Sequence, residues 1–205
     1  MLLLLFHTTA HAACDSTAAC LKLIETAQAD TRTVTARFTQ TKYLSLLDEP
    51  VVSTGRFMFK RPDKVRLDVE TPRQATVLVD GRNISIPGMT ESDKQQIGMT
   101  PMAQLFTELG AMFGGSPALL QKHFEVVAQA SGNGIAVTLT PKLADWQRLF
   151  RRIQLTFTQP DLVLGAMQLD DSLGDRLEIV MSDVQRNADL PDTTFRLSLT
   201  PGGVP

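Results

Sequence analysis

Apolar and polar side chains alternate along much of this 205-residue chain. Residues 64–70 place Val65, Leu67 and Val69 between charged neighbours. The same period of two recurs in residues 135–140, 153–158 and 195–199. Further strands are predicted at Val34–Lys42, Ser53–Lys60, Thr76–Asp80, Ile84–Ile86, Phe124–Gln129, Leu162–Leu169 and Arg176–Val184. Such alternation is typical of antiparallel strands that bury one face. About ten strands on one chain favour a single strongly curved sheet or an open barrel.

Turn residues separate these strands. Pro62-Asp63 predicts a tight turn, and Asp80-Gly81 is the preferred pair for a two-residue hairpin. Gly132-Asn133-Gly134 predicts another hairpin turn. The predicted fold class is therefore mainly β with an α cover, an unclosed antiparallel β-barrel of about ten strands with helices over an apolar cavity.

Few helices are predicted, and we expect them to cover the sheet. Ser16 or Thr17 caps a first helix, which places Cys20, Leu23, Ile24 and Ala27 on one face. A second helix starts at Thr100-Pro101 and ends at Gly114-Gly115, and a short third one starts at Ser116-Pro117. The second helix carries a broad apolar stripe, formed by Met102, Leu105, Phe106, Leu109, Met112 and Phe113.

The charge balance is nearly neutral, with 20 Lys plus Arg, 22 Asp plus Glu and a net charge of −2. Because there is no basic cluster, the chain lacks the electrostatic attraction on which binding to nucleic acid or to anionic membranes rests. Two Cys cannot build a structural zinc site or an iron–sulfur cluster. We therefore expect no metal, no cofactor and no nucleic-acid partner.

The N-terminus is similar to a secretory signal. Leu2–Phe6 is an unbroken apolar run, and Ala10-His11-Ala12 fits the small-x-small cleavage pattern. We expect residues 1–12 to be a signal peptide and residues 13–205 to form a single mature domain. The run is shorter than the usual stretch of about 7–15 residues and no Lys or Arg precedes it, so we expect the true start codon to lie upstream. A disordered apolar N-terminus of a cytosolic protein is the alternative interpretation.

Cys14 and Cys20 leave three interpretations open. In an oxidising compartment the pair can close a small disulfide loop at the start of the first helix. Alternatively, Cys14 is the acylated N-terminal residue of a lipoprotein, although His11 stands where such signals have an aliphatic residue. The third interpretation is two unpaired thiols.

The search for catalytic groups argues against an enzyme. His123 is the only His beyond the predicted signal, and a lone His at a helix-to-strand junction is usually a surface residue. Asp170-Asp171 and Asp48-Glu49 are adjacent carboxylates, whose side chains would point to opposite faces of an extended strand. We therefore interpret both pairs as solvated loop charges. There is also no nucleophile elbow and no Gly-rich phosphate loop.

Methionine and phenylalanine recur together on the predicted apolar surfaces. The set comprises Met58, Met102, Met112, Met167 and Met181 with Phe57, Phe59, Phe106, Phe113 and Phe157. Soft methionines suit a surface that repacks around variable guests. A plain filled core explains the same composition, and composition does not separate the two.

Several short motifs resemble those of the periplasmic lipoprotein carrier family LolA, in the same order and at similar spacing. In the N-terminal half they are Ala36-Arg37-Phe38-Thr39-Gln40, residues 55–67 with Lys60-Arg61-Pro62, and Leu78-Val79-Asp80-Gly81. Leu139-Thr140-Pro141-Lys142 and residues 195–201 continue the likeness. The resemblance covers essentially the whole predicted mature chain.

The resemblance implies a periplasmic chaperone whose apolar cavity takes the acyl chains of lipoproteins and carries them to the outer membrane. The implied cavity wall comprises Phe38, Phe57, Phe59, Val65, Leu67, Leu105, Phe106, Leu109, Met112, Phe113, Phe157, Met167 and Met181. In the family, the Arg of Lys-Arg-Pro holds the helical lid shut, and Arg61 matches it here. A rim salt bridge of Arg61 to Asp63 or Asp68 is the simpler alternative.

The implied partners are an inner-membrane lipoprotein-releasing transporter and an outer-membrane acceptor, with the carrier itself a monomer. Departures from the family leave the client open, because Leu67 and residues 83–86 stand where family members often have Trp or Tyr. A paralogue that carries free acyl lipid or polyene is one alternative, and an anchored acceptor acylated at Cys14 is another. A lipid-sensing regulatory domain ranks last, because it would normally need a second interaction domain for which this length leaves no room.

Overall fold

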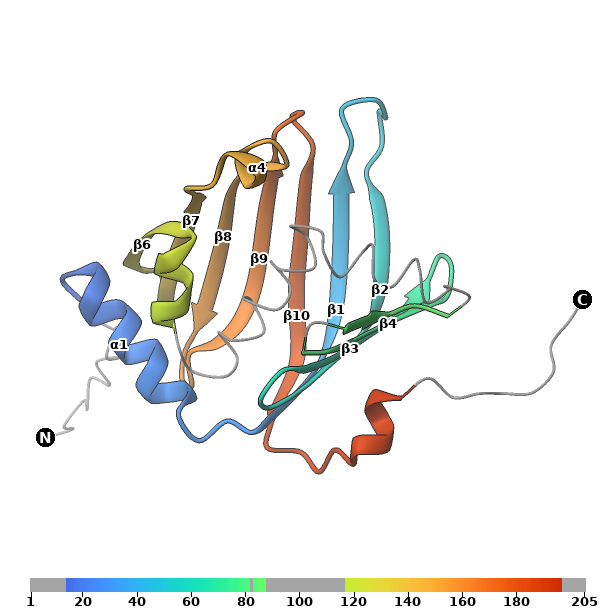
Figure 1. The fold of residues 1–205 in the computed structure, drawn as a ribbon, viewed down its shortest axis with the longest axis horizontal. Coiled ribbons are helices and arrows are strands. Elements are labelled where there is room, and N and C mark those ends of the chain that lie inside the picture. The colour runs from blue at the N-terminus through green and yellow to red at the C-terminus, as the bar shows by residue number, and fades with distance from the viewer. Residues whose placement is uncertain (1–13, 82, 88–116, 197–205) are drawn as a thin grey trace, which may run out of the picture.

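The fold is taken from a computed structural model, which describes residues 14–81, 83–87 and 117–196 (Figure 1). Its ten strands are β1 (Thr33–Tyr43), β2 (Val51–Lys60), β3 (Lys64–Thr71), β4 (Ala75–Asp80), β5 (Asn83–Ser85), β6 (Phe124–Ser131), β7 (Gly134–Pro141), β8 (Phe150–Thr158), β9 (Val163–Asp171) and β10 (Arg176–Arg186). They form one sheet, in the order β5-β4-β3-β2-β1-β10-β9-β8-β7-β6. This confirms the predicted fold class.

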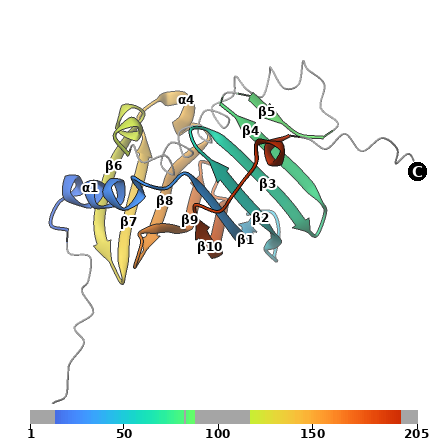
Figure 2. The ribbon, with the colours of Figure 1, turned by 90° about the horizontal axis from the view of Figure 1, so that it is seen from below.

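The sheet consists of two meanders that meet where the first strand pairs with the last. Strands β1 to β5 form one meander and β6 to β10 the other, and every neighbouring pair is antiparallel. β1 joins the two meanders by pairing with β10, from Val34 opposite Arg186 to Tyr43 opposite Arg176. The strands curve around one side of the sheet, as Figure 2 shows. Among the described residues β5 and β6 end the order at opposite edges, so the sheet is open.

The hairpins lie where the turn residues predicted them. Asp80 pairs with Asn83, and Ser131 pairs with Gly134, so both connections span two residues. Gly132 has a φ of +55°, a conformation that glycine adopts without strain.

The strand predicted over residues 195–199 does not begin at Phe195. Asp192–Phe195 instead forms a short 3-10 helix, η2, and residues 197–199 lie outside the described part of the chain. Lys60 donates hydrogen bonds to the Leu190 carbonyl (2.7 Å) and to Asp192 (2.6 Å), and Arg66 donates to the Thr194 carbonyl (2.8 Å). These side-chain donors satisfy carbonyl groups that a strand would direct to a neighbouring strand, which favours the tight turn here.

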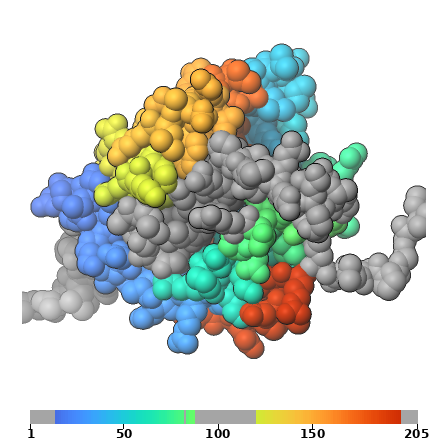
Figure 3. All heavy atoms as spheres, viewed as in Figure 1, coloured from blue at the N-terminus to red at the C-terminus, as the bar shows by residue number. Residues whose placement is uncertain are grey.

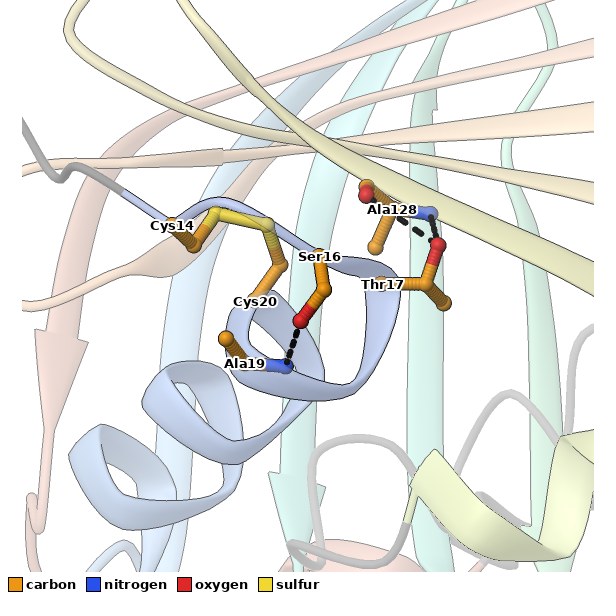
Figure 4. Close-up of a disulfide and its surroundings, with 6 residues drawn as sticks. All are labelled: Cys14, Ser16, Thr17, Ala19, Cys20 and Ala128. Carbon is orange, nitrogen blue, oxygen red and sulfur yellow. Dashed lines mark hydrogen bonds between the residues drawn. A yellow bond between two sulfur atoms is a disulfide. The ribbon is translucent and has the colours of Figure 1, made fainter.

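Helix α1 (Thr17–Gln28) begins at the predicted cap and packs beside β6. The Ser16 hydroxyl accepts a hydrogen bond from the Ala19 amide at 3.2 Å. Thr17 contacts the backbone of Ala128 through its hydroxyl, which donates to the carbonyl (3.3 Å) and accepts from the amide (3.1 Å; Figure 4). The N-terminal turn of α1 is therefore fastened directly to β6.

The buried face of α1 differs in part from the predicted one. Cys20 and Ile24 are buried as expected, and Ala27 is half-buried, but Leu23 is 40% exposed. Leu21 and Gln28 complete the buried face instead. The helix is rotated relative to its apolar stripe because Gln28 turns inward, where its side chain hydrogen-bonds to the Leu162 carbonyl at 2.7 Å.

The short third helix predicted after Ser116 is the 3-10 helix η1 (Pro117–Lys122), and a further short helix, α4 (Ala144–Gln147), connects β7 to β8. Trp146 of α4 is buried against Phe124 and Phe150, with ring centroids 4.9 and 5.9 Å away. This aromatic group closes one end of the core under β6–β8. The second predicted helix, residues 100–115, lies outside the described residues.

Gly55 occupies a strand position where a side chain has no room. A Cβ at this position would collide with the Asp68 carbonyl oxygen and would lie 2.7 Å from the Phe38 ring. The register between β2 and β3 also shifts between Thr54 and Gly55. The absence of a Cβ thus leaves room for the Phe38 ring beside Gly55.

We expect Gly55→Ala to destabilise the fold by about 1–3 kcal/mol, because a methyl group there overpacks a fixed backbone contact. The measurement is the urea midpoint of unfolding. Gly165→Ala is the matched control, since its Cβ would first meet the Thr158 side chain, at 3.1 Å. Equal midpoints for the two variants would contradict this account.

Candidate ligand-binding site

One face of the sheet is apolar across its whole width. Residues that are register partners on neighbouring antiparallel strands project on the same face. One row of partners runs through Val79, Val65, Phe59 and Val34. A second row, in the other meander, runs through Ile179, Met167, Leu155, Val137 and Ala128. Phe38 of β1 lies opposite Met181 of β10 and joins the two rows, although Gln40 and Arg186 occupy the partner positions of Ile179 and Val34. We call this largely apolar face the inner face of the sheet.

The inner face is fully buried at its two flanks and only half-buried in the middle. One buried cluster packs α1 and η1 against β6–β8, and a second occupies β1–β5. Between them, several inner-face side chains of β9 and β10 are partly buried, namely Met167, Leu177, Ile179 and Met181, while Leu169 of β9 belongs to the first buried cluster. The middle strip of the inner face is the part of the apolar surface that a guest could contact with least repacking.

The residues predicted to line the cavity fall into three groups. Those that are buried inside the two clusters are Phe38, Phe57, Phe59, Val65 and Phe157. Met167 and Met181 belong to the middle strip, whereas Leu67 is partly buried against the cluster of β1–β5. The other five, Leu105, Phe106, Leu109, Met112 and Phe113, lie outside the described residues.

Arg61 lies at the end of β2 and contacts the C-terminal end of α1. Its Nη2 atom donates a hydrogen bond to the Gln28 carbonyl at 2.8 Å, and its backbone amide donates to the Arg32 carbonyl at 2.8 Å. Within the described part of the chain Arg61 forms no ion pair with Asp63 or Asp68; Asp68 pairs with Arg66 instead, at 2.8 Å. The Nε atom of Arg61 is buried and lacks a hydrogen-bond partner among the described residues.

Arg186, at the end of β10, makes the matching contact to α1. Its Nη1 atom donates to the Ala27 carbonyl at 2.8 Å, and its Nη2 atom lies 3.3 Å from the carboxylate of Asp161. The last carbonyl groups of a helix carry partial negative charge and lack helical partners, so cationic donors stabilise them. Arg61 and Arg186 thus hold adjacent carbonyl groups of α1 from two strands.

Gln28 adds a third link between α1 and the sheet. Its amide nitrogen donates to the Leu162 carbonyl, and its amide oxygen accepts a hydrogen bond from the Thr31 hydroxyl at 3.0 Å. The sequence analysis missed both Gln28 and Arg186. Gln28 follows the predicted inward residue Ile24 by four positions, and this spacing was a signal for it. The role of Arg186 depends on the pairing of β10 with β1, which is distant in sequence, so no local pattern encodes it.

Lys60, which precedes Arg61, fastens the C-terminal segment to the same end of the sheet. Its ammonium group hydrogen-bonds to Asp192 at 2.6 Å. This hydrogen bond and the charges of Lys60 and Lys64 hold the pKa of the Asp192 carboxyl below its ordinary value. Two consecutive cationic residues therefore hold the two segments that flank this end of the sheet, α1 and residues 190–192.

The residues considered for catalysis have structural roles. Asp170 and Asp171 are both in β9, and Asp170 pairs with Arg152, so the interpretation of this pair as solvated loop charges was wrong. Burial raises the pKa of Asp170, but hydrogen bonds from Gln168 and Arg152 outweigh it and the net pKa is lowered. Asp171 accepts hydrogen bonds from the Leu173 and Asp175 amides.

His123 is half-buried, not a surface residue as expected, because its ring stacks on Trp146 with centroids 5.5 Å apart. Asp48 and Glu49 are exposed in the β1–β2 connection. In the described ranges no group of three or more His, Cys, Asp and Glu side chains is placed to hold a metal ion.

Cys14 and Cys20 are joined in a disulfide, with Cα atoms 5.1 Å apart (Figure 4). The bond connects the residues before α1 to its first turn, close to the contact between Thr17 and Ala128. Cys20 is fully buried in the cluster under α1. Among the described residues no helix is both long enough and apolar enough to cross a membrane.

The chain belongs to the LolA family, whose model, described as outer membrane lipoprotein carrier protein LolA, matches residues 29–198. The outer-membrane lipoprotein carrier protein of Pseudomonas syringae pv. syringae is 27% identical over 94% of this chain and 88% of its own length. The carrier protein of Dechloromonas aromatica is 31% identical over 82% of this chain and 78% of its own length. Family membership supports the prediction of a binding protein rather than an enzyme.

Among solved structures, a chain of the Pseudomonas aeruginosa MucA/MucB complex has a similar fold. It superposes with a TM-score of 0.52 and 11% sequence identity, over 86% of this chain and 59% of that one. At this identity the likeness concerns the fold alone.

We expect Arg186→Gln to loosen the C-terminal turn of α1, because it removes a charge-assisted hydrogen bond worth roughly 1.5–3 kcal/mol. Hydrogen–deuterium exchange at residues 26–31 should accelerate by about tenfold or more. Arg176→Gln, at the opposite end of the same strand, is the control and should leave that exchange unchanged. Equal exchange in wild type and Arg186→Gln would show that Arg186 does not hold the helix.

Proposed function

We propose that this protein is a periplasmic carrier that binds the acyl chains of lipoproteins against the inner face of its sheet and delivers them toward the outer membrane. One observation supports the binding site above all. The apolar inner face is continuous, yet its middle strip, including Met167, Ile179 and Met181, is only half-buried between two packed clusters. Unbranched methionine side chains there can repack around a guest of variable shape.

The energetics of such a carrier require a device that limits affinity. Burying an acyl chain gains about 0.8 kcal/mol per CH₂, so a long chain could gain roughly 10 kcal/mol. A carrier that binds this tightly would not release its client. A cover that must be displaced before the chain enters offsets part of the gain, because its contacts in the empty state are lost on binding.

Helix α1 is the described element suited to this role. Its buried face packs on the inner side of β6–β8, and its C-terminal carbonyl groups are held by Arg61 and Arg186. In this proposal Arg61 is the latch of the empty state, and its release accompanies entry of the acyl chain. The buried Nε of Arg61 has no hydrogen-bond partner among the described residues, so this donor is available when the contact to α1 is released.

The disulfide bears on the choice between a soluble carrier and an anchored acceptor. The Sγ atom of Cys14 cannot be acylated while it is bonded to Cys20. The arrangement therefore favours a chain without its own lipid anchor. A periplasmic location accords with this bond, because disulfides persist in oxidising compartments.

Native mass spectrometry of protein purified gently from cells tests the client directly. We expect a bound acylated polypeptide, and we expect the denatured chain to carry Cys14 as a disulfide with no added acyl mass. Bound free lipid or polyene would replace the proposed client, and acyl groups on Cys14 would make the protein an anchored acceptor. A protein that is empty under all gentle conditions would count against the carrier function.

We expect Arg61→Leu to retain its client but to fail in passing it on, because the closed state that competes with the acyl chain loses a hydrogen bond. The measurement is transfer of a labelled lipoprotein from the loaded carrier to outer-membrane vesicles. Arg56→Leu on the same strand is the control, since Arg56 pairs with Glu70 at 2.9 Å on the exposed face. Client release equal to wild type in Arg61→Leu would rule out the latch.

A further inference from the structure

Three connections between strands lie close together at the end of the sheet that is opposite Arg61. They are the β1–β2 connection (residues 44–50), the β7–β8 connection with α4 (residues 142–149) and the β9–β10 connection (residues 172–175), all at the top of Figure 1. The Ser45 amide donates to the Asp175 carboxylate at 2.7 Å, and the Ser172 amide donates to the Leu149 carbonyl at 3.1 Å. The three connections, with the strand residues next to them, form one continuous edge (Figure 3), which we call the loop rim.

The loop rim concentrates exposed apolar side chains. Of the eleven large apolar residues that are exposed in the described ranges, eight lie on it: Tyr43, Leu46, Leu47, Val51, Val52, Leu143, Leu149 and Leu173. Leu46 and Leu173 are 94% and 83% exposed, which means that their side chains pack against almost nothing. Turns normally carry polar residues, so leucines at two turn tips of one edge require a reason outside the fold.

Most charged side chains of the rim form ion pairs or hydrogen bonds with other residues of this protein. Arg152 pairs with Asp170 and Arg148 with Asp145, while Arg151 donates to the Ser172 carbonyl at 3.0 Å. Arg176 pairs with Glu178, and its guanidinium stacks over the Tyr43 ring at 4.3 Å. Asp171 and Asp175 accept backbone hydrogen bonds. Lys42, Lys142, Asp48 and Glu49 are exposed and balance one another in sign. The rim therefore offers little net charge to a partner.

A polar cleft of about 590 Å³ opens beside the turns that carry Leu46 and Leu173. It is lined by Tyr43, Thr140, Arg151, Arg152, Asp170, Asp171, Gly174, Asp175 and Arg176. Three guanidinium and three carboxylate groups line it, so it complements a partner that presents both signs of charge. The rim thus combines projecting leucines, an aromatic ring with a cation on its face, and a cleft of mixed charge.

We propose that the loop rim docks on the surface of a phospholipid membrane, with Leu46, Leu47 and Leu173 inserted among the acyl chains and zwitterionic headgroups against the cleft. Tyr and Arg are suited to the level between water and hydrocarbon, because each has an apolar body and a polar end. A flat apolar protein partner fits less well, since the polar cleft interrupts the apolar surface. This inference goes beyond the carrier function and does not depend on which client is bound.

The expected affinity is weak and reversible. Even one myristoyl chain gives only marginal membrane binding, and three leucines bury less apolar surface than such a chain. Because insertion of apolar groups carries the binding and the rim is nearly neutral, salt should have little effect on it.

Flotation of the client-free protein with phosphatidylcholine vesicles, at low and high salt, tests the proposal. We expect the wild type to float with the vesicles at both salt concentrations. Leu46→Ser and Leu173→Ser should each lower the partition coefficient by about tenfold, and the triple variant with Leu47→Ser should remain in the aqueous phase. The variants should fold as the wild type does, because these side chains are exposed.

Val180→Ser is the matched control, because Val180 is 55% exposed on β10 away from the rim, and it should float like the wild type. A wild type that stays in the aqueous phase, or a triple variant that floats equally well, would overturn the proposal. If the wild type does not float but the triple variant holds its client and no longer delivers it, the rim binds a protein partner instead. Since the assay uses no client, failure of the carrier function would not affect its result.

Discussion

The pairing of β1 with β10 is the constraint on which the rest of the structure depends. Each meander is built from hairpins between neighbours in sequence, and it could form its own ladder without the other. Only the contact between the first and last strands brings the two apolar faces into one surface and places the ends of β2 and β10 on the same side of α1. This contact closes a loop of about 140 residues, so it forms at a high cost in chain entropy and is expected to form late in folding.

Helix α1 links the pairing of β1 with β10 to the proposed binding of a guest. Its first turn is fixed to β6. Its last turn is held by the side chains of Arg61 and Arg186, at the ends of β2 and β10, and its own Gln28 side chain donates to a backbone carbonyl of the β8–β9 connection. The helix therefore spans from one meander to the seam with the other. Any movement that widens the inner face has to break charge-assisted hydrogen bonds at one end of α1, while the disulfide and Thr17 keep the other end in place. If the proposed binding displaces α1, these attachments would let the helix rotate about its N-terminal end without detaching.

The sequence alone was sufficient to predict the positions of most strands. In each of them apolar residues such as Val65, Leu67 and Val69 alternate with polar ones, and a shift of the strand register by one residue would expose all the apolar side chains. The order of the strands was not accessible, since the pairing of Val34 with Arg186 is not local. Leu23 was assigned to the wrong side of α1 because buried Gln28 outweighs the apolar stripe. Arg61 was found through family motifs, whereas Arg186 and Leu46 belong to no motif or periodic pattern, and their surroundings exist only in the folded chain.

An open sheet faces a hazard that a closed barrel avoids, because each outer strand presents unpaired backbone groups to which another copy could add a strand. Here the hydroxyl of Thr17 occupies both backbone groups of Ala128 in the middle of β6, and at the other border β5 is only three residues long. In the described part of the sheet, neither border therefore offers a long uninterrupted ladder for templated growth into fibrils. One side chain on a helix thus lets the sheet remain open without making the protein prone to polymerise.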